Sequence, residues 1–209
     1  MTEVDGRLAR GERTRTAVLD TAVALASEAG LDGLSLGQLA ERLHVSKSGL
    51  FAHWASKEEL QLAAIEHARE QWRRLIVLPA LEQPRGVRRL FALHEARLAF
   101  YTARTLPGGC FFANAEFEFT GRAGAIPDRL VVILGEWIEL LERLVAEAVE
   151  LGELPPATDV RRLAFEVDAA GVAALLHSRL LTRSCDDARM AVLGRLRELT
   201  PDPDLLPAS

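Results

Sequence analysis

Lysine is nearly absent from this chain of 209 residues, which holds only Lys47 and Lys57. Tyrosine occurs once, and aromatic residues make up 6% of the sequence. The formal net charge is −5, so the surface as a whole does not attract polyanions. Any binding of nucleic acid must therefore depend on a local cluster of basic residues.

Long hydrophobic runs are also missing. No apolar stretch approaches the roughly 20 residues of a membrane helix, and the polar start M-T-E-V-D-G-R-L-A-R lacks the apolar region of a signal peptide. We therefore expect a cytoplasmic protein with no membrane partner. The cysteines, Cys110 and Cys185, are 75 positions apart. Without a secretory signal, reduced thiols are expected rather than a disulfide.

The basic residues that are present gather near the N-terminus. In residues 33 to 57 the bases outnumber the acids, whereas from Glu58 onward the acids outnumber the bases. The N-terminal end is thus the surface expected to attract DNA. Four arginines precede it: Arg7, Arg10, Arg13 and Arg15. This start is either a solvated tail or a segment that contacts phosphate or the minor groove.

Apolar residues recur every three or four positions, which predicts an all-α fold. With 49% hydrophobic residues, the chain is long enough for a small domain followed by a larger one with its own core. The aromatic stretch from Cys110 to Phe119 is interpreted as a short helix, and the proline-rich tail after residue 200 is expected to be frayed. The other expected helices are 13–29, 36–43, 47–53, 56–75, 84–101, 127–151, 159–181 and 186–199.

The segment from Gly33 to Lys57 predicts two short helices that are joined by a tight turn and followed by a third helix. Ser35 and Ser46 precede the two short helices, where their hydroxyl groups can accept hydrogen bonds from free backbone amides. His44 stands at a turn position that tends to require positive φ, which histidine tolerates better than most residues. The motif is expected to span residues 34–53.

Two further signals flank this motif. Gly30 follows the last apolar residue of the first helix and can take the left-handed conformation that closes it. Ser56 and Glu59 have the spacing of a capping box and start the next helix. The positive charge of Lys57 in its first turn opposes the helix dipole, and a bound phosphate would offset that cost.

One face of the two short helices is apolar and is expected to pack on the core. The other face is polar, and we call it the free face. The apolar positions are Leu36, Leu39, Ala40, Leu43, Val45 and Leu50. The free face carries Ser46, Lys47, Ser48, Gly49 and His53. An α-helix fits the major groove, and short polar or cationic side chains at its start reach base edges and phosphates. The free face therefore predicts a DNA reader, although an ordinary polar surface has the same composition.

The chain resembles the TetR family of bacterial transcriptional regulators. The resemblance extends from T-A-V-L-D-T-A-V-A-L through H-V-S-K-S-G-L-F-A-H-W-A-S-K-E-E-L. The resemblance implies an N-terminal three-helix helix-turn-helix DNA-binding domain, residues 10–70, and a larger helical ligand-binding and dimerisation domain, residues 80–200. It implies DNA contact at Ser35, Lys47, Ser48, Gly49, Phe51, His53 and Lys57, the last with phosphate. Phe51 and Trp54 replace the usual tyrosine and phenylalanine, which puts the target sequence in question.

Catalytic and metal sites have weak support. G-L-S-L-G around Ser35 matches the hydrolase nucleophile elbow, but a helix and a loop precede it where an elbow needs a strand. The histidines lack the spacing of metal ligands, so no metal or other cofactor is expected. Cys110 has no neighbouring cation in the sequence to lower its pKa, which favours inert packing over oxidant sensing. We predict a protein that is not an enzyme.

A small-molecule pocket is predicted in the second domain, where a few polar groups stand among aromatic ones. Its candidate residues are His94, Tyr101, Phe111, Asn114, Glu116, Phe117 and Trp137. Plain core packing explains such residues equally well.

The last two long helices are the expected dimer interface, because small and branched residues on them suit close helix packing. These residues are Val160, Leu163, Val167, Ala170, Gly171, Ala174, Leu181, Ala188, Ala191, Val192 and Leu196. A two-fold homodimer would place its reading helices in major grooves about 34 Å apart on a double-stranded operator. The resulting hypothesis is a repressor released from DNA by an unidentified small-molecule effector. An effector-independent architectural DNA-binding protein and a helical enzyme are the alternatives.

Overall fold

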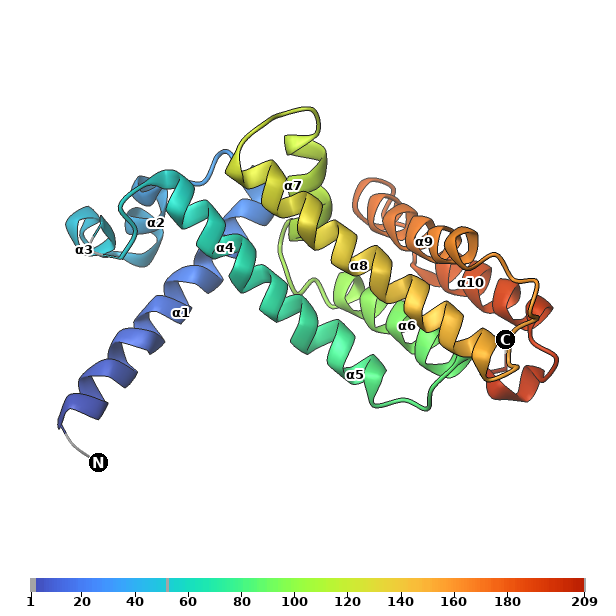
Figure 1. Cartoon of the computed structure of the whole chain (residues 1–209). Helices are drawn as coiled ribbons and strands as arrows, with labels where there is room; N and C mark the ends of the chain where they lie inside the picture. Colours follow the sequence, from blue (N-terminus) through green and yellow to red (C-terminus); the bar gives the residue numbers. More distant parts are fainter. Residues whose placement is uncertain (1–2, 52, 209) are drawn as a thin grey trace. The chain divides into compact units, whose positions relative to one another are not determined.

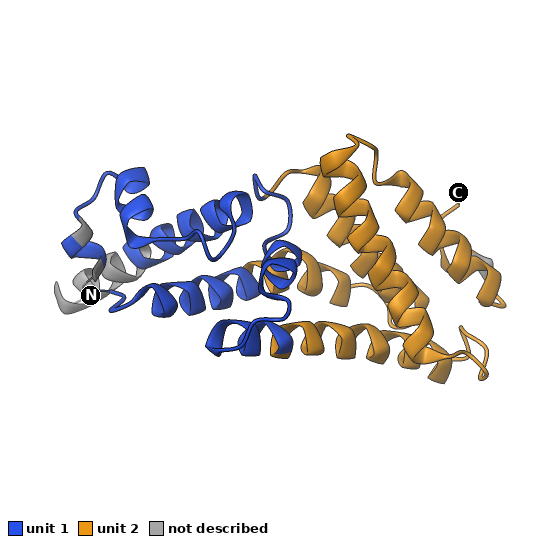
Figure 2. Ribbon diagram, turned by 90° about the horizontal axis from the view of Figure 1, so that it is seen from above, with its two compact units in different colours: residues 1–70, 106–131 blue, residues 71–105, 132–209 orange. Residues whose placement is uncertain are grey.

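The computed structural model describes the backbone of residues 3–51 and 53–208, and within these ranges it contains helices and no strand. Side chains are described for residues 14–46, 48–50, 53–202 and 204–208. The predicted all-α fold is confirmed. The chain forms two compact units, residues 1–70 with 106–131 and residues 71–105 with 132–209 (Figure 2).

The first unit holds the N-terminal helices, one later helix and the start of another (Figure 1). Its helices are α1 (Glu3–Ala29), α2 (Leu36–Leu43), α3 (Lys47–Phe51), most of α4 (Lys57–Trp72), α7 (Phe111–Phe119) and the start of α8 (Ala125–Glu150). Its core includes the fully buried side chains of Val23, Leu39 and Trp54. The segment 106–131 belongs to this unit although it follows residues 71–105 of the other unit in the chain.

The second unit is a helical bundle. Its elements are the end of α4, the π-helix η1 (Arg73–Val77), α5 (Leu78–Leu81), α6 (Val87–Thr102), most of α8, α9 (Val160–Leu180), α10 (Asp186–Leu199) and the short 3₁₀ helix η2 (Pro203–Leu205). Helix α6 packs against both α9 and α10. The inward stripe predicted for α6 is buried, including Leu90, Phe91 and His94.

The helix boundaries agree with the predictions in most places, and α9 and α10 begin and end within one residue of them. The stretch after Cys110 is the expected short helix, α7. Helix α1 begins at Glu3 and not at the predicted residue 13, so the backbone of the arginine-rich start is helical. Helix α4 continues through η1 into α5 without a break. The π-helical segment η1, in which Leu78 N donates to the Arg73 carbonyl, comes just before Pro79, which has no N–H to donate.

Two expectations were wrong. Val45, predicted on the apolar face, is 46% exposed, and it follows the left-handed His44 at which the periodicity of α2 ends. The C-terminal tail is packed rather than frayed, since Leu206 is 5% exposed and the Leu205 carbonyl accepts a hydrogen bond from Arg88 Nε at 3.0 Å. Within the described residues, no helix has the length and apolar character needed to cross a membrane.

Candidate nucleic-acid interface and ligand site

Serine side chains define the starts of the two short helices. Ser35 is the N-cap of α2, and its Oγ accepts a hydrogen bond from Gln38 N at 3.2 Å. Ser46 Oγ accepts from Gly49 N at 3.2 Å, which caps α3 in the same way. Both predicted caps are confirmed. Each serine hydroxyl thus lies at the N-terminus of its helix, where the helix dipole favours a negative charge.

The turn between α2 and α3 depends on His44. This residue has φ 54° and ψ 38°, the left-handed conformation expected from the sequence. Its N–H donates to the Glu41 carbonyl at 3.2 Å, and Val45 N donates to the Ala40 carbonyl at 3.0 Å. These bonds satisfy the last carbonyls of α2 and fix where α3 begins.

The start of α3 presents short polar groups. Ser46, Ser48 and Gly49 are exposed, and the Ser48 hydroxyl donates to Ser46 Oγ at 3.2 Å. A Cβ on Gly49 would stand 3.2 Å from Ser46 Oγ, so a side chain there would crowd the cap. Lys47 and Phe51 belong to α3, but their side chains lie outside the described residues.

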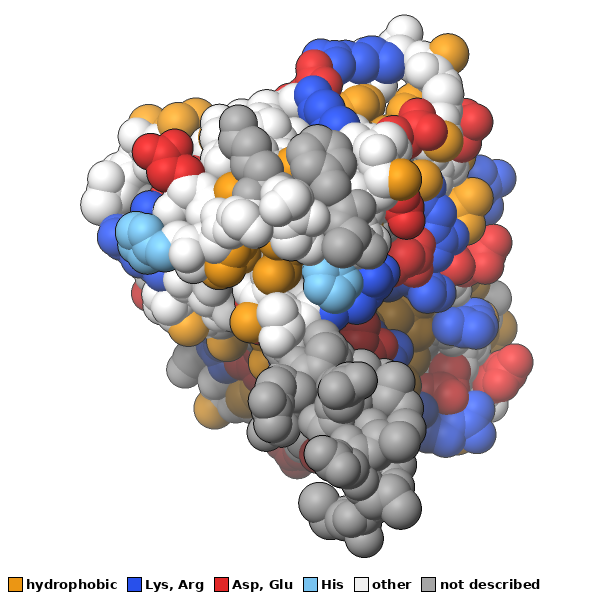
Figure 3. All heavy atoms as spheres, turned by 90° about the vertical axis from the view of Figure 1, so that its left-hand side faces the viewer, with side chains coloured by type: hydrophobic (Ala, Val, Ile, Leu, Met, Phe, Trp, Pro, Cys, Tyr) orange, Lys and Arg blue, Asp and Glu red, His pale blue; other side chains and the backbone are white. Residues whose placement is uncertain are grey.

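The end of α3 joins this exposed face to the core. His53 is exposed, whereas the neighbouring Trp54 is fully buried, with ring centroids 5.6 Å apart. Arg15 of α1 lies over the Trp54 ring, 5.0 Å from its centroid, which anchors a basic side chain of α1 on this core residue. Figure 3 looks onto this end of the chain and shows Lys and Arg side chains beside histidine on the described part of the face.

Lys57, the predicted phosphate ligand at the start of α4, is exposed but already paired. Its ammonium donates to the backbone carbonyl of Asp32 and lies 3.2 Å from the Asp32 carboxylate. Arg122 Nη1 donates to the other carboxylate oxygen at 2.9 Å. The bond from Arg122, followed by that from Lys57, lowers the pKa of the Asp32 carboxyl. Asp32 therefore stays ionised near neutral pH.

The capping box at the start of α4 is present in a modified form. Ser56 Oγ accepts from Glu59 N at 3.1 Å as predicted. The Glu59 carboxylate returns to Ala55 N at 2.7 Å rather than to Ser56 N. The turn leading into Lys57 is thus held from both sides.

Three of the predicted ligand residues lie in the second unit, and two of them meet at one buried ion pair. Arg97 of α6, 5% exposed, donates from Nη1 to Asp168 Oδ1 at 2.8 Å and from Nε to the Tyr101 hydroxyl at 2.7 Å. Trp137 Nε1 donates to the same Asp168 oxygen at 2.9 Å. The structure thus brings Tyr101 and Trp137 together around Arg97.

The surroundings of Arg97 are aromatic. Its guanidinium carbon lies 5.4 Å from the Trp137 ring centroid, 5.9 Å from that of Tyr101 and 6.0 Å from that of Trp72. Gly171 of α9 leaves the space that the guanidinium occupies, since a Cβ there would stand 2.4 Å from Nη1. We call Trp72, Arg97, Tyr101, Trp137 and Asp168 the Arg97 cluster.

His94 lies one turn before Arg97 on α6. Its Nε2 is 3.2 Å from the Ala188 carbonyl, and among the described residues its Nδ1 has no hydrogen-bond partner. Burial, reinforced by the positive charge of Arg97, lowers the pKa of His94 to about 4. The imidazole is therefore neutral at physiological pH and offers Nδ1 as an acceptor.

The other four ligand candidates lie on α7 in the first unit. Phe111 is buried, Glu116 is half-buried and Phe117 is 66% exposed. Asn114 Nδ2 donates to the Ser27 carbonyl at 2.9 Å and to the Gly108 carbonyl at 3.1 Å, so it ties α7 to α1. Within the first unit Asn114 thus joins two helices.

Sequence reasoning missed Arg97, Asp168 and Trp72. Arg97 stands three residues after His94 and four before Tyr101. This spacing places Arg97 on the inward face of α6, so the sequence could have predicted a buried charge. Asp168, 71 positions further on, gave no such signal, because only the packing of α9 on α6 makes it the counter-ion.

A capped helix-turn-helix joined to a separate helical unit is the arrangement of a DNA-binding regulator. Residues 18–64 match the family model of bacterial regulatory proteins of the tetR family, and residues 86–192 match that of the tetracyclin repressor-like C-terminal domain. The chain belongs to the TetR family of transcriptional regulators.

Relatives and solved structures agree with this assignment. The chain is 26% identical over 151 residues to the HTH-type transcriptional repressor ComR of Escherichia coli K12, which is 72% of each protein. A TetR transcriptional regulator from Chloroflexus aurantiacus is 26% identical, with a TM-score of 0.80 over 91% of this chain and 95% of that one. AibR, solved with isovaleryl coenzyme A and operator DNA, shares the fold at 20% identity, with a TM-score of 0.66 over 88% and 97%.

Proposed function

We propose that this regulator is a homodimeric, cytoplasmic repressor that binds a double-stranded operator and is released from it by a small molecule. Residues 10–70 would read the DNA, and residues 80–200 would hold the effector and the dimer interface. The observation that carries the proposal is the start of α3, where Ser46, Ser48 and Gly49 are exposed beside a turn fixed by His44.

The residues proposed to contact DNA have distinct roles. Ser35 and Ser46 cap α2 and α3, so their hydroxyl groups and the adjacent amides would meet phosphates. Lys47, Ser48 and Gly49 come next on α3 and would face base edges. Phe51, His53 and Lys57 would complete the contacts, the last with phosphate.

The Lys47→Ala variant tests base readout. We expect reduced discrimination between the operator and unrelated DNA of equal length, measured by competition titration at fixed salt. A wild-type thermal melt of Lys47→Ala is the control for its fold. Unchanged affinity and discrimination in Lys47→Ala would remove Lys47 from the reading surface, and binding that ignores sequence altogether would favour an architectural role.

An exposed apolar stripe on α9 supports the homodimer. Phe165 is 70% exposed, Leu176 42% and Leu180 77%, at helical spacing that places them on one side of α9. Large exposed apolar groups that share a face mark interaction surfaces, and a two-fold axis pairs such a face with itself.

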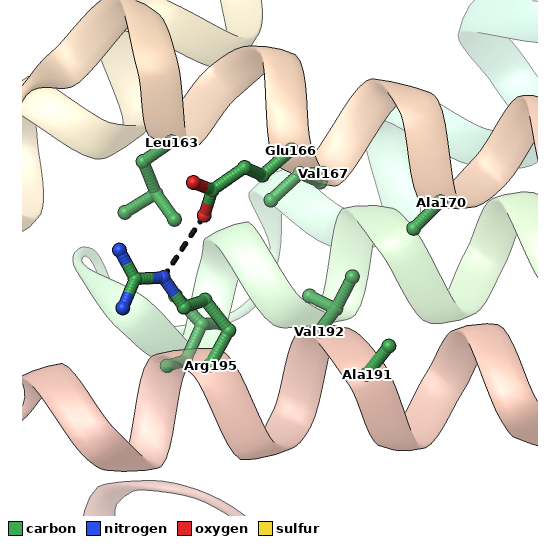
Figure 4. A pocket seen from close by; sticks show the side chains of 8 residues that line it. Leu163, Glu166, Val167, Ala170, Ala191, Val192 and Arg195 are labelled. Atoms are coloured by element: carbon green, nitrogen blue, oxygen red, sulfur yellow. Dashed lines mark hydrogen bonds and ion pairs between the residues drawn. The ribbon is translucent and has the colours of Figure 1, made fainter.

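A separate groove lies between α9 and α10 (Figure 4). It is lined by Leu163, Glu166, Val167, Ala170, Ala191, Val192, Arg195 and Leu196, and it is crossed by an ion pair of 2.9 Å between Arg195 Nε and Glu166. Of the predicted interface residues, Leu163, Val167, Gly171, Ala174, Val192 and Leu196 are already buried within one chain. The stripe headed by Phe165 is therefore the surface that we propose for the partner subunit.

Phe165→Asp tests the interface. The charge would have to be buried without a partner, so we expect monomers by sedimentation velocity at micromolar concentration and a large loss of operator affinity. Leu151→Asp, at the 48% exposed residue after α8, is the matched control and should remain dimeric. Dimers in Phe165→Asp that match the wild type would place the interface elsewhere.

The Arg97 cluster and His94 support an effector site in the second unit. They supply a neutral imidazole acceptor, an ion pair and three aromatic rings, the mixture that lines small-molecule sites. An effector that binds one conformation better would weaken operator binding, typically by about 1–3 kcal/mol.

The effector is best sought by solvent extraction of the purified protein and mass spectrometry. A compound found in this way should lower operator affinity when it is added back. Its binding to Tyr101→Phe should weaken while operator affinity without the compound stays unchanged. A compound that binds without changing operator affinity would contradict release by an effector.

A further inference from the structure

Three charged side chains from separate segments of the first unit form a continuous exposed cluster, the Asp32 cluster. Asp32 lies in the α1–α2 loop, Lys57 begins α4, and Arg122 lies between α7 and α8. The carboxylate of Asp32 forms two ion pairs. Its Oδ1 lies 3.2 Å from Lys57 Nζ, and its Oδ2 lies 2.9 Å from Arg122 Nη1. All three side chains are about half exposed, at 47–49%.

Arg122 reaches this position because α7 is docked firmly on the reading unit. The Glu118 carboxylate accepts from Leu31 N at 2.7 Å and from Asp32 N at 3.1 Å. Gly30 leaves room for that carboxylate, since a Cβ there would stand 2.6 Å from Glu118 Oε1. The same loop that carries Asp32 is therefore held by α7.

A second contact fixes Arg122 itself. Its guanidinium carbon lies 4.8 Å from the ring centroid of Phe119, which is 8% exposed. An arginine stacked on a buried ring and paired with an anchored carboxylate has a defined direction. Chance contacts between long surface side chains lack such supports.

The charges of the Asp32 cluster do not cancel. One carboxylate stands between two cations beside the N-terminus of α4 and close to the start of α2. The neighbouring Glu118 carboxylate is held separately by the backbone amides of Leu31 and Asp32. Exposed ion pairs of this kind contribute little to stability, so an incoming phosphate can replace the carboxylate at small cost. The geometry of one acid bridging two cations is also the geometry that a phosphate group would adopt there.

We infer that Arg122, although it lies outside the helix-turn-helix, supplies a second phosphate contact beside Lys57 in the operator complex, and that Asp32 holds both cations until DNA replaces it. The inference rests on the proposed function, since it assumes that Lys57 meets phosphate. It extends the DNA-binding surface to the loop after α7.

The test measures how operator affinity depends on salt. Each phosphate contact contributes about 0.9 to the slope of log affinity against log salt concentration. Because each subunit of the proposed homodimer would lose one contact, Arg122→Gln should reduce the slope for dimer binding by about 1.8, and Arg122→Lys should retain it. A purely structural role for Arg122 would change affinity or melting temperature without changing the slope.

Arg129→Gln is the matched control. Arg129 also lies in the first unit and is paired with a carboxylate of α4, Glu66, at 3.0 Å. Glu66 is nine residues beyond Lys57, about 13 Å along the helix at 1.5 Å per residue. That distance exceeds the screening length of about 8–10 Å at physiological salt, so the slope should stay at the wild-type value.

The outcomes separate the two hypotheses. A reduced slope in Lys57→Ala with a wild-type slope in Arg122→Gln would overturn this inference and leave the proposed function standing. Wild-type slopes in both variants would overturn the phosphate role of Lys57 as well. Asp32→Asn, which removes the competing charge, should bind the operator several-fold more tightly with an unchanged slope, and weaker binding would overturn the part assigned to Asp32.

Discussion

The turn between α2 and α3 and the Arg97 cluster are two ways of fixing polar groups. The groups of the turn, from Ser35 to Gly49, are neighbours in sequence and mostly exposed. The Arg97 cluster draws its residues from α4, α6, α8 and α9 and buries an ion pair. Loss of a local cap changes the free energy of unfolding only slightly. A buried charge, in contrast, is tolerated only while every partner is present.

The largest effect should follow from breaking the buried ion pair. Arg97→Met keeps much of the side-chain volume but leaves Asp168 and Trp137 without their cationic partner. Removing one member of a buried pair costs about 3–5 kcal/mol, and the value here should fall near the lower limit because the Asp168 side chain is 20% exposed. Urea unfolding of the full chain measures it.

Arg162→Met is the control for that substitution. Arg162 pairs with Glu166 on the surface of α9 at 3.1 Å, with 72% of its side chain exposed. Its loss should change the unfolding free energy by less than about 1 kcal/mol. Equal effects of the two variants would show that burial of Arg97 does not distinguish the cluster from a surface pair.

Gly171→Ala should break the same cluster from the opposite helix. The added Cβ would stand 2.4 Å from Arg97 Nη1, and the guanidinium is held by Asp168 and Tyr101. Overpacking of this kind costs about 1–3 kcal/mol, which outweighs the gain of about 1 kcal/mol from replacing glycine in a helix. A thermal melt gives the sign, and a stabilised variant would mean that Arg97 can move aside freely.

The contribution of the buried His94 to the free energy of unfolding depends on pH. Its pKa is lowered to about 4 by burial, while in the unfolded chain it is near 6.5. The unfolded state therefore takes up the proton first, so this contribution to stability is complete above pH 6.5 and is lost as the pH falls towards 4.

Between pH 7.5 and pH 5 the loss from His94 should be about 2 kcal/mol. His94→Gln should therefore show a pH dependence of its unfolding free energy that is smaller by this amount, as measured by urea titrations at both pH values. His53→Gln, which removes an exposed histidine instead of a buried one, is the matched variant. Identical pH profiles for wild type and His94→Gln would mean that His94 is not buried as a neutral ring.

The same contrast explains what the sequence could predict. Caps at Ser35 and Ser46, the left-handed His44 and the bounds of α9 and α10 follow from residues within a few positions of each other, and all were predicted. The partner of Lys57 was not, because Asp32 is 25 positions away and Arg122 comes from a loop beyond another unit of the chain.

The predicted dimer stripe shows a second limit. Periodicity identifies the apolar side of α9 but does not tell which apolar residues face the core of their own chain. Leu163 and Val167 pack inside, while Phe165 and Leu180, two positions and more away, remain exposed. The packing of α6 and α10 against α9 decides which of its apolar residues are buried and which stay exposed.

The smallest effects belong to the turn, and they have opposite signs. Ser46→Ala removes the acceptor for Gly49 N and should cost about 1 kcal/mol. His44→Gly relieves a side chain held at φ 54°, a conformation that costs a non-glycine residue about 1–2 kcal/mol, partly offset by the greater freedom of glycine when unfolded. Because both changes act at the exposed end of a five-residue helix, hydrogen exchange at Gly49 and Leu50 should detect them more readily than global unfolding. Faster exchange in Ser46→Ala and slower exchange in His44→Gly would show that the turn is set by these local bonds, whereas equal rates in both would mean that packing of Leu50 against the core holds α3 without them.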